Sequence, residues 1–159
     1  QLVREPHVKH YCEIGMNGGH SVVAMMLASP TLTVDTFDLM RWNYSAPVAS
    51  LLRSTFRDRF QLHEGYSQCT LPTFVNRTDL RCDVLLVDGS HVENGARQDL
   101  QLLRPIASSS ARIVVDDIND NPGWALAKLH RRKTLRILES FHFAKNSEHN
   151  PCQRKPSAE

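Results

Sequence analysis

The sequence lacks any apolar run close to the roughly 20 residues that a membrane-spanning helix needs, so no membrane span is expected. It also lacks a strong charge of one sign, because 19 basic and 17 acidic residues leave a formal charge of only +2. This balance does not predict a nucleic-acid partner. A chain of 159 residues is long enough to bury one core and too short for two ordinary domains. We therefore expect a single globular domain.

None of the four cysteines forms a CxxC pair, so the sequence predicts neither a zinc site nor a redox pair. Reduced, structural thiols are the expectation. The chain starts at Gln1 without a signal-like segment, which leaves a targeting segment absent or removed. A cytoplasmic location is expected, and the sequons Asn43-Tyr44-Ser45 and Asn76-Arg77-Thr78 leave a secretory compartment open.

Segments typical of strands and of helices alternate along the chain. Short apolar or β-branched runs predict strands at 10–14, 32–39, 60–63, 83–87 and 111–115. Apolar residues at helical spacing predict helices at 21–28, 48–56, 71–75, 92–103 and 124–132. Pro105 and the run Ser108-Ser109-Ser110 are expected to end the fourth of these helices. A last strand is expected within 135–143, so the domain would span 1–143 and a polar tail 144–159.

This alternation predicts a three-layer α/β fold, in which a mostly parallel twisted sheet carries helices on both faces. In such sheets the ligand lies beyond the carboxyl ends of the strands. Each of the first five predicted strands is followed there by glycine or an acidic residue. The five segments are Glu13-Ile14-Gly15, Asp38, Gly65-Tyr66-Ser67-Gln68, Asp88-Gly89-Ser90-His91 and Asp116-Asp117.

The loop Gly15-Met16-Asn17-Gly18-Gly19 lets the backbone turn sharply and approach a ligand closely. It does not match the dinucleotide fingerprint GxGxxG, because its third position is Asn17. A nucleoside without phosphate therefore suits it better, and a nicotinamide-dependent oxidoreductase is disfavoured. Asp38 is well placed to accept hydrogen bonds from two ribose hydroxyls, although a cap or turn aspartate is the alternative.

These motifs together resemble those of the class I S-adenosylmethionine-dependent methyltransferases. Residues 13–21 (EIGMNGGHS) are similar to the glycine-rich motif I of that family, and 36–39 (TFDL) to its acidic second-strand motif. More narrowly, 83–91 (DVLLVDGSH) and 113–118 (IVVDDI) resemble the metal-dependent small-molecule O-methyltransferases, the catechol O-methyltransferase-like group and its sugar-methylating relatives. The resemblance covers about residues 10–143. It implies a Rossmann-like methyltransferase fold.

The resemblance also implies which residues bind S-adenosylmethionine. Gly15, Asn17 and Gly19 would surround its methionine part. Glu13 and Ser21 would support the glycine-rich loop. Asp38 would hold the ribose. Gly65, Ser67 and Gln68 would flank the adenine, and Asp88 would stand beside both the cofactor and a metal ion.

Methyl transfer from a sulfonium requires an acceptor oxygen aligned with the methyl carbon and relieved of its proton. A magnesium ion held by Asp88, Asp116 and Asp117 would do both, since hard cations prefer carboxylate ligands. We expect Asp88 and His91 to be catalytic, with His91 accepting the proton where relatives of the catechol type carry a lysine. A metal-bound hydroxide is the alternative acceptor, and turn or cap roles are the alternative for the Asp116-Asp117 pair.

The predicted function is O-methylation of a small hydroxylated acceptor, a sugar or a phenol, with a homodimer left open. The sequence departs from the family in two ways. Only about ten residues precede the first strand, and the family's final antiparallel strand is not evident after Phe143. A catalytically inactive cofactor-binding or scaffold domain is therefore the alternative.

Overall fold

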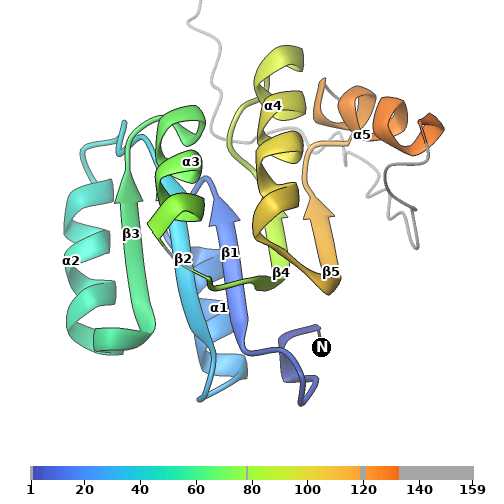
Figure 1. The fold of residues 1–159 in the computed structure, drawn as a ribbon. Helices are drawn as coiled ribbons and strands as arrows, with labels where there is room; N and C mark the ends of the chain where they lie inside the picture. Colours follow the sequence, from blue (N-terminus) through green and yellow to red (C-terminus); the bar gives the residue numbers. More distant parts are fainter. Residues whose placement is uncertain (1, 78, 119–120, 133–159) are drawn as a thin grey trace, which may run out of the picture.

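The computed structural model describes residues 2–77, 79–118 and 121–132 (Figure 1). Five strands form one sheet in the order β3-β2-β1-β4-β5. They are β1 (His10–Ile14), β2 (Thr33–Asp38), β3 (Phe60–Glu64), β4 (Cys82–Val87) and β5 (Ala107–Val115). All four neighbouring pairs are parallel. The predicted α/β fold is confirmed, and no final antiparallel strand lies within the described ranges.

Helices follow the strands and cover both faces of the sheet. They are α1 (His20–Ala28), α2 (Ser45–Phe56), α3 (Ser67–Arg77), α4 (Glu93–Leu103) and α5 (Asn121–Arg131), with short 3-10 turns η1 (Leu2–Arg4), η2 (Arg57–Arg59) and η3 (Arg104–Ile106). In Figure 1, α3 and α4 lie in front of the sheet and α1 lies behind it. No described helix is long and apolar enough to cross a membrane.

The central strands are buried on both faces, which explains why residues 83–87 form a nearly continuous apolar run. In β4, Leu85 and Val87 pack in the core beneath α3, α4 and α5. Val84 packs on the opposite face, in the core that α1 and α2 cover. A helix layer on each side therefore leaves the carboxyl ends of the strands as the edge at which a ligand has access to the sheet.

The strand order reverses between β1 and β4, and two of the predicted site residues follow these strands. The backbone N–H of Gly15 donates to the carbonyl of Phe37 at 2.9 Å, and that of Asp88 donates to the carbonyl of Ile14 at 2.9 Å. The residues just past each strand thus continue the ladder. This holds the two loops at the reversal point, where parallel sheets bind ligands.

The largest differences from the predicted boundaries are at the starts of α3 and β5. Helix α3 begins at Ser67 rather than near residue 71, because its first residues, SQCT, lack the apolar repeat that marks a helix. The run Ser108-Ser109-Ser110 lies within β5 instead of ending a helix. A register irregularity between Cys82 and Val84 absorbs this lengthened start of the strand. The predicted strand within 135–143 and the tail 144–159 lie outside the described residues.

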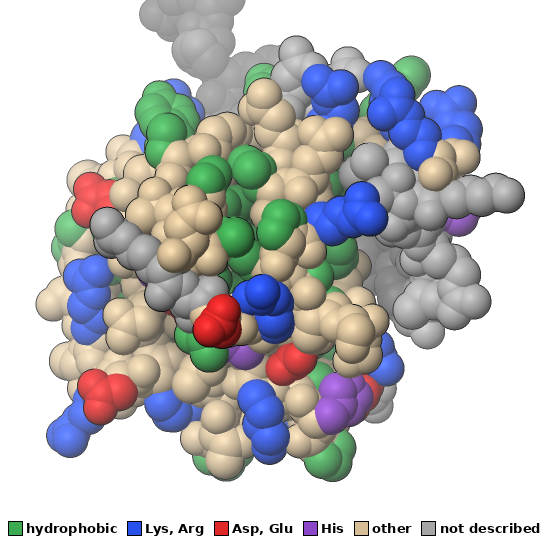
Figure 2. Space-filling model, viewed as in Figure 1, with side chains coloured by type: hydrophobic (Ala, Val, Ile, Leu, Met, Phe, Trp, Pro, Cys, Tyr) green, Lys and Arg blue, Asp and Glu red, His purple; other side chains and the backbone are tan. Residues whose placement is uncertain are grey.

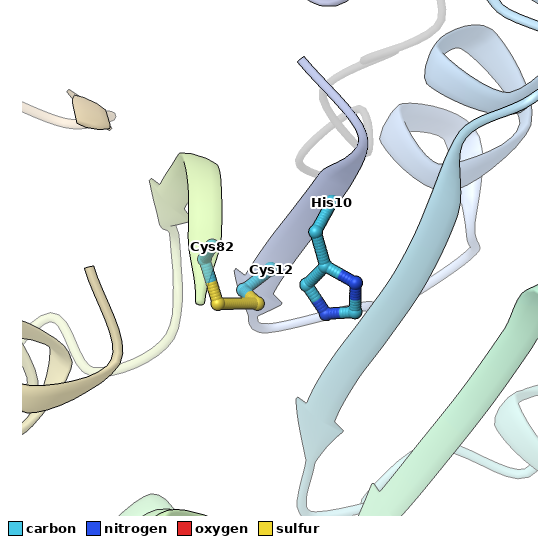
Figure 3. Close-up of side chains that lie close together, drawn as sticks. All are labelled: His10, Cys12 and Cys82. Carbon is cyan, nitrogen blue, oxygen red and sulfur yellow. A yellow bond between two sulfur atoms is a disulfide. The ribbon is translucent and has the colours of Figure 1, made fainter. Parts of the chain in front are cut away.

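A disulfide joins Cys12 of β1 to Cys82 of β4, 70 residues apart in the sequence (Figure 3). Both cysteines are fully buried, and the imidazole of His10 lies beside them. The expectation of reduced thiols is therefore wrong for this pair. Spacing along the sequence could not reveal it, because the pairing of β1 with β4 brings the two residues together. Cys69 is a free, exposed thiol.

Candidate functional site

The glycine-rich loop makes the sharp turn that the sequence predicts. Gly15 and Gly19 have φ angles of +95° and +72°, and Asn17 has a φ of 49°. A side chain on Gly15 would overlap the carbonyl oxygen of Asp88, so glycine is required there for close packing as well as for backbone conformation. Gly19 directly precedes α1, and the backbone N–H of Val23 donates to its carbonyl at 3.0 Å.

The carboxylate of Asp38 connects this loop to the end of β2. Its Oδ2 accepts a hydrogen bond from the backbone N–H of Asn17 at 3.0 Å, and its Oδ1 accepts one from Met40 at 2.6 Å. Asn17 and Met40 both have positive φ angles, so the carboxylate stabilises backbone conformations that side-chain-bearing residues rarely adopt. Each carboxylate oxygen can accept a further hydrogen bond, which leaves capacity for ribose hydroxyls.

An aromatic pair that the sequence analysis did not identify lies next to this connection. The hydroxyl of Tyr44 donates to Asn17 Oδ1 at 2.5 Å. The rings of Trp42 and Tyr44 stack with 6.2 Å between centroids and 7° between planes, and both are substantially exposed. The segment between β2 and α2 therefore contacts the glycine-rich loop from the solvent side. No sequence motif signals this contact.

Glu13 is fully buried beneath the same loop. Its Oε2 accepts the hydroxyl of Tyr11 at 2.5 Å, the side chain of Ser21 also hydrogen-bonds to its carboxyl group, and Oε1 has no partner within the described structure. Burial raises the pKa of Glu13 to about 7, and the charges of Asp88 and Asp38 act in the same direction, against the two hydrogen bonds. That Glu13 and Ser21 support the glycine-rich loop of a cofactor site stays a prediction.

The segment predicted to flank adenine lies at the carboxyl end of β3. The backbone N–H of Gly65 donates to the carbonyl of Asp38 at 2.9 Å, and Ser67 begins α3. Gln68 lines a shallow pocket between α3 and α4, together with Gln98, Gln101 and Leu102. Figure 2 shows hydrophobic side chains between these two helices. The glycine-rich loop and Asp38 do not line this pocket, so it only borders the predicted cofactor site.

A group of acidic residues and a histidine lies at the ends of β4 and β5. The side-chain oxygens of Asp88 and Asp117 and a ring nitrogen of His91 all lie within 4.8 Å of one another. His91 Nδ1 is 3.0 Å from Asp117 Oδ2. Partial burial and, after it, the charges of Asp116 and Asp117 together raise the pKa of Asp88 to about 6, against the opposing effect of His91.

The predicted metal ligands are therefore brought together only in part. Asp88 and Asp117 share the group with His91, whereas Asp116 is outside it. The Oδ1 atom of Asp116 accepts the backbone N–H of Asp117 at 2.8 Å, at a residue whose φ is 52°. Two carboxylates and an imidazole within reach of one point form a donor set that suits a divalent cation.

Asp99 of α4, which no sequence motif indicated, is 1% exposed. Its Oδ1 accepts the hydroxyl of Ser67 at 2.5 Å. A signal was present, because Asp99 lies on the same helical face as the buried Ala96, Leu100 and Leu103. A carboxylate on the apolar face of a helix requires a specific partner.

A family model described as a methyltransferase domain matches residues 12–118. The chain belongs to this family. The resemblance to class I methyltransferases is thereby confirmed, and the methyltransferase domain places its glycine-rich loop and Asp38 at the edge where the strand order reverses. A search of curated proteins found no match.

Solved methyltransferases share the fold of this domain. The O-methyltransferase TomG from Streptomyces achromogenes, in complex with SAM, is 20% identical with a TM-score of 0.69 over 86% of this chain and 66% of its own. An O-methyltransferase from Bacillus cereus in complex with SAH is 17% identical, with a TM-score of 0.65 over 82% of this chain and 64% of its own. CalS11, a TDP-rhamnose 3'-O-methyltransferase of calicheamicin biosynthesis, is 16% identical, with a TM-score of 0.65 over 86% of this chain and 69% of its own. The chain thus spans about two thirds of the length of these enzymes, and the likeness establishes its fold.

Proposed function

We propose that this methyltransferase domain binds S-adenosylmethionine at the carboxyl ends of β1 and β2 and transfers the methyl group to a hydroxyl of a small acceptor, a sugar or a phenol. The observation that carries the proposal is the hydrogen bond of Asp38 to the backbone of Asn17. It places an acid suited to ribose hydroxyls directly beside a glycine-rich turn that admits a ligand close to the backbone.

The solved relatives support the cofactor and the acceptor class. TomG was crystallised with SAM and the Bacillus cereus enzyme with SAH. CalS11 acts on TDP-rhamnose, which favours a sugar as the acceptor. The ten residues proposed for the cofactor site are those predicted from sequence: Glu13, Gly15, Asn17, Gly19, Ser21, Asp38, Gly65, Ser67, Gln68 and Asp88.

For the methyl transfer itself, we propose that His91 accepts the proton of the acceptor hydroxyl. With its Nδ1–H donating to Asp117 Oδ2, the ring takes the tautomer in which Nε2 is the basic nitrogen. The acceptor hydroxyl would give its proton to Nε2 while its oxygen attacks the methyl carbon in line with the sulfur. The carbon–sulfur bond breaks and the positive charge on sulfur is neutralised, which leaves S-adenosylhomocysteine.

A divalent ion such as Mg²⁺ would be held by Asp88 and Asp117, with Asp116 or His91 as the third protein ligand. When bound, such an ion would lower the pKa of the acceptor hydroxyl and fix its position. His91 cannot at once donate to Asp117 through Nδ1 and bind the ion through the same nitrogen. The dyad of His91 with Asp117 is therefore lost when the ion takes His91 Nδ1 as its third ligand, whereas with Asp116 as that ligand both can form.

Calorimetric titration with S-adenosylhomocysteine tests the cofactor claim. We expect micromolar binding by the wild type and at least about tenfold weaker binding by Asp38→Ala, because one carboxylate serves both the loop and the ribose. Asp58→Ala, which removes an exposed acid from η2, is the matched control and should bind like the wild type. The cofactor claim is rejected if the wild type fails to bind at high micromolar concentration.

Thermal unfolding in Mg²⁺ and in chelator tests the metal site without relying on activity. Binding to the folded state stabilises it, so we expect Mg²⁺ to raise the wild-type Tm. Asp117→Ala should remove this increase, and Asp116→Ala should reduce it less. Equal Tm values for the wild type in Mg²⁺ and in chelator would reject the metal and leave the dyad of His91 with Asp117.

A catalytically inactive cofactor-binding domain is the second candidate. The likeness to TomG and the Bacillus cereus enzyme, at 20% and 17% identity, establishes the fold alone, which an inactive domain would share. Cofactor binding without methyl transfer in a broad screen of sugars and phenols would support it, and a single methylated product would exclude it.

A further inference from the structure

Asp99 is a buried carboxylate that contacts two separate loops of the site. It lies in α4, it is 1% exposed, and its Oδ1 accepts the hydroxyl of Ser67 at 2.5 Å. The backbone of Ser90 lies next to the same carboxyl group and favours its charged form. Ser67 starts α3, just after β3, whereas Ser90 lies in the loop after β4. One side chain therefore links the loops that follow two different strands.

These two strands are not neighbours in the sheet. The order β3-β2-β1-β4 places β2 and β1 between them. A link between the β3–α3 and β4–α4 loops therefore spans the width of both strands, on the face of the sheet that α3 and α4 cover. Helices α3 and α4 pack side by side on this face (Figure 1), which lets a residue of α4 make the connection.

A contribution to stability alone does not account for Asp99. Its Oδ2 is buried without a close partner among the described residues, and burial raises the pKa of the group. A buried carboxylate that is incompletely satisfied costs free energy, and such groups are kept mainly where they serve a site. The same Oδ2 would lie 3.5 Å from a Cβ on Gly89, so the carboxyl also packs against the residue that follows Asp88.

We propose that Asp99 is a positioning residue that fixes the β3–α3 loop against the β4–α4 loop and so shapes the adenine end of the cofactor site. The inference rests on the proposed function, since it assumes that Ser67 and Gln68 flank the adenine. Asp99 contacts neither the sulfur nor the acceptor. Its loss should therefore weaken recognition of the base and leave recognition of the rest of the cofactor unchanged.

The test compares S-adenosylhomocysteine with S-inosylhomocysteine, which differs only at the edge of the base. In the wild type, the adenine compound should bind more tightly. Asp99→Leu should weaken its binding about tenfold and bring the two affinities close together. Asp99→Asn keeps an acceptor for Ser67 and should retain most of the preference. Asp35→Asn removes the charge of another buried carboxylate, in the middle of β2, and should leave the preference unchanged.

Ser67→Ala provides a second route to the same contact if Asp99→Leu does not fold. It should reduce the preference for adenine, and combined with Asp99→Asn it should cause little further loss, because both changes act on one hydrogen bond. An unchanged preference in folded Asp99→Leu, or in Ser67→Ala, would overturn the proposal.

Hydrogen exchange separates this inference from the proposed function. Without ligand, Asp99→Leu should speed exchange in the segments 65–71 and 88–92 together, and Asp35→Asn should not. If the wild type binds no S-adenosylhomocysteine, the proposed function fails, and coupled exchange in these two segments would still support the link between the loops. Unchanged exchange in both segments would overturn the link itself.

Discussion

Gly15 and Asp88 lie so close together that a Cβ atom on Gly15 would overlap the backbone carbonyl oxygen of Asp88. The contact joins the loops after β1 and β4, at the point where the strand order reverses. Because the obstructing atoms belong to the backbone, a side-chain movement cannot relieve the overlap. The position of the glycine-rich loop thus depends on the absence of a side chain at one residue.

Gly15→Ala should lower the free energy of unfolding by more than about 2 kcal/mol, because it adds the overlap to a positive φ angle. Gly18→Ala is the matched control in the same loop. A Cβ there would meet only the imidazole of His20, an exposed side chain that can move, and the loss should stay below about 1 kcal/mol. Urea denaturation measures both, and equal losses would contradict the explanation.

Reduction of the Cys12–Cys82 disulfide should destabilise the domain strongly. The bridge closes a loop of 70 residues and restricts the unfolded chain, which stabilises the folded state by about 4 kcal/mol. We expect the double variant Cys12→Ser/Cys82→Ser to lower the Tm as far as a reductant does. Cys69→Ser is the control and should leave the Tm unchanged both with and without reductant. A wild-type Tm that does not respond to reductant would show that the bridge does not form.

The disulfide also bears on where the protein is found. Buried disulfides form and persist in oxidising compartments and are rare in the cytoplasm. If the pair Cys12–Cys82 is oxidised in cells, we expect an oxidising compartment instead of the cytoplasmic location expected from sequence. Rapid alkylation of free thiols in intact cells, followed by mass spectrometry, distinguishes the two, since only a reduced pair would be alkylated.

Stability should fall between about pH 5 and pH 7 because of Glu13. The folded state holds its proton up to a pKa of about 7, against 4.5 for a free carboxyl group, so the folded chain binds more protons than the unfolded chain in this range. The free energy of unfolding then decreases as the pH rises, by roughly 3 kcal/mol in total. Glu13→Gln should remove this slope in urea denaturation followed across pH. A wild-type slope retained in this variant would assign the titration to another group.

Tyr44→Phe should weaken binding of S-adenosylhomocysteine about three- to tenfold, because the loss of the hydrogen bond to Asn17 frees the glycine-rich loop on its solvent side. The free energy of unfolding should change little, since Tyr44 is 43% exposed. Ser54→Ala, which removes an exposed hydroxyl that bonds to Leu51, is the control. Calorimetry measures the affinities, and an unchanged affinity would show that the contact does not support the site.

Sequence patterns were sufficient for most of the strands because local chemistry determines them. The strand His10–Ile14 has the predicted bounds, and β5 differs most among the strands, because its serine run resembles the end of a helix. The residues at the carboxyl ends of the strands were identified for the same reason. In a parallel sheet, all of these ends lie along one edge.

The sequence by itself determined the α/β class, the parallel sheet and the edge at which Asp38 and the glycine-rich loop meet, because periodicity, glycine and proline act over a few neighbouring residues. Only the tertiary structure decided the Cys12–Cys82 bridge, the grouping of His91 with Asp117, and the link from Asp99 to Ser67. These pairs lie on separate elements, and their contacts depend on how the helices and strands pack against one another. No local pattern encodes that packing.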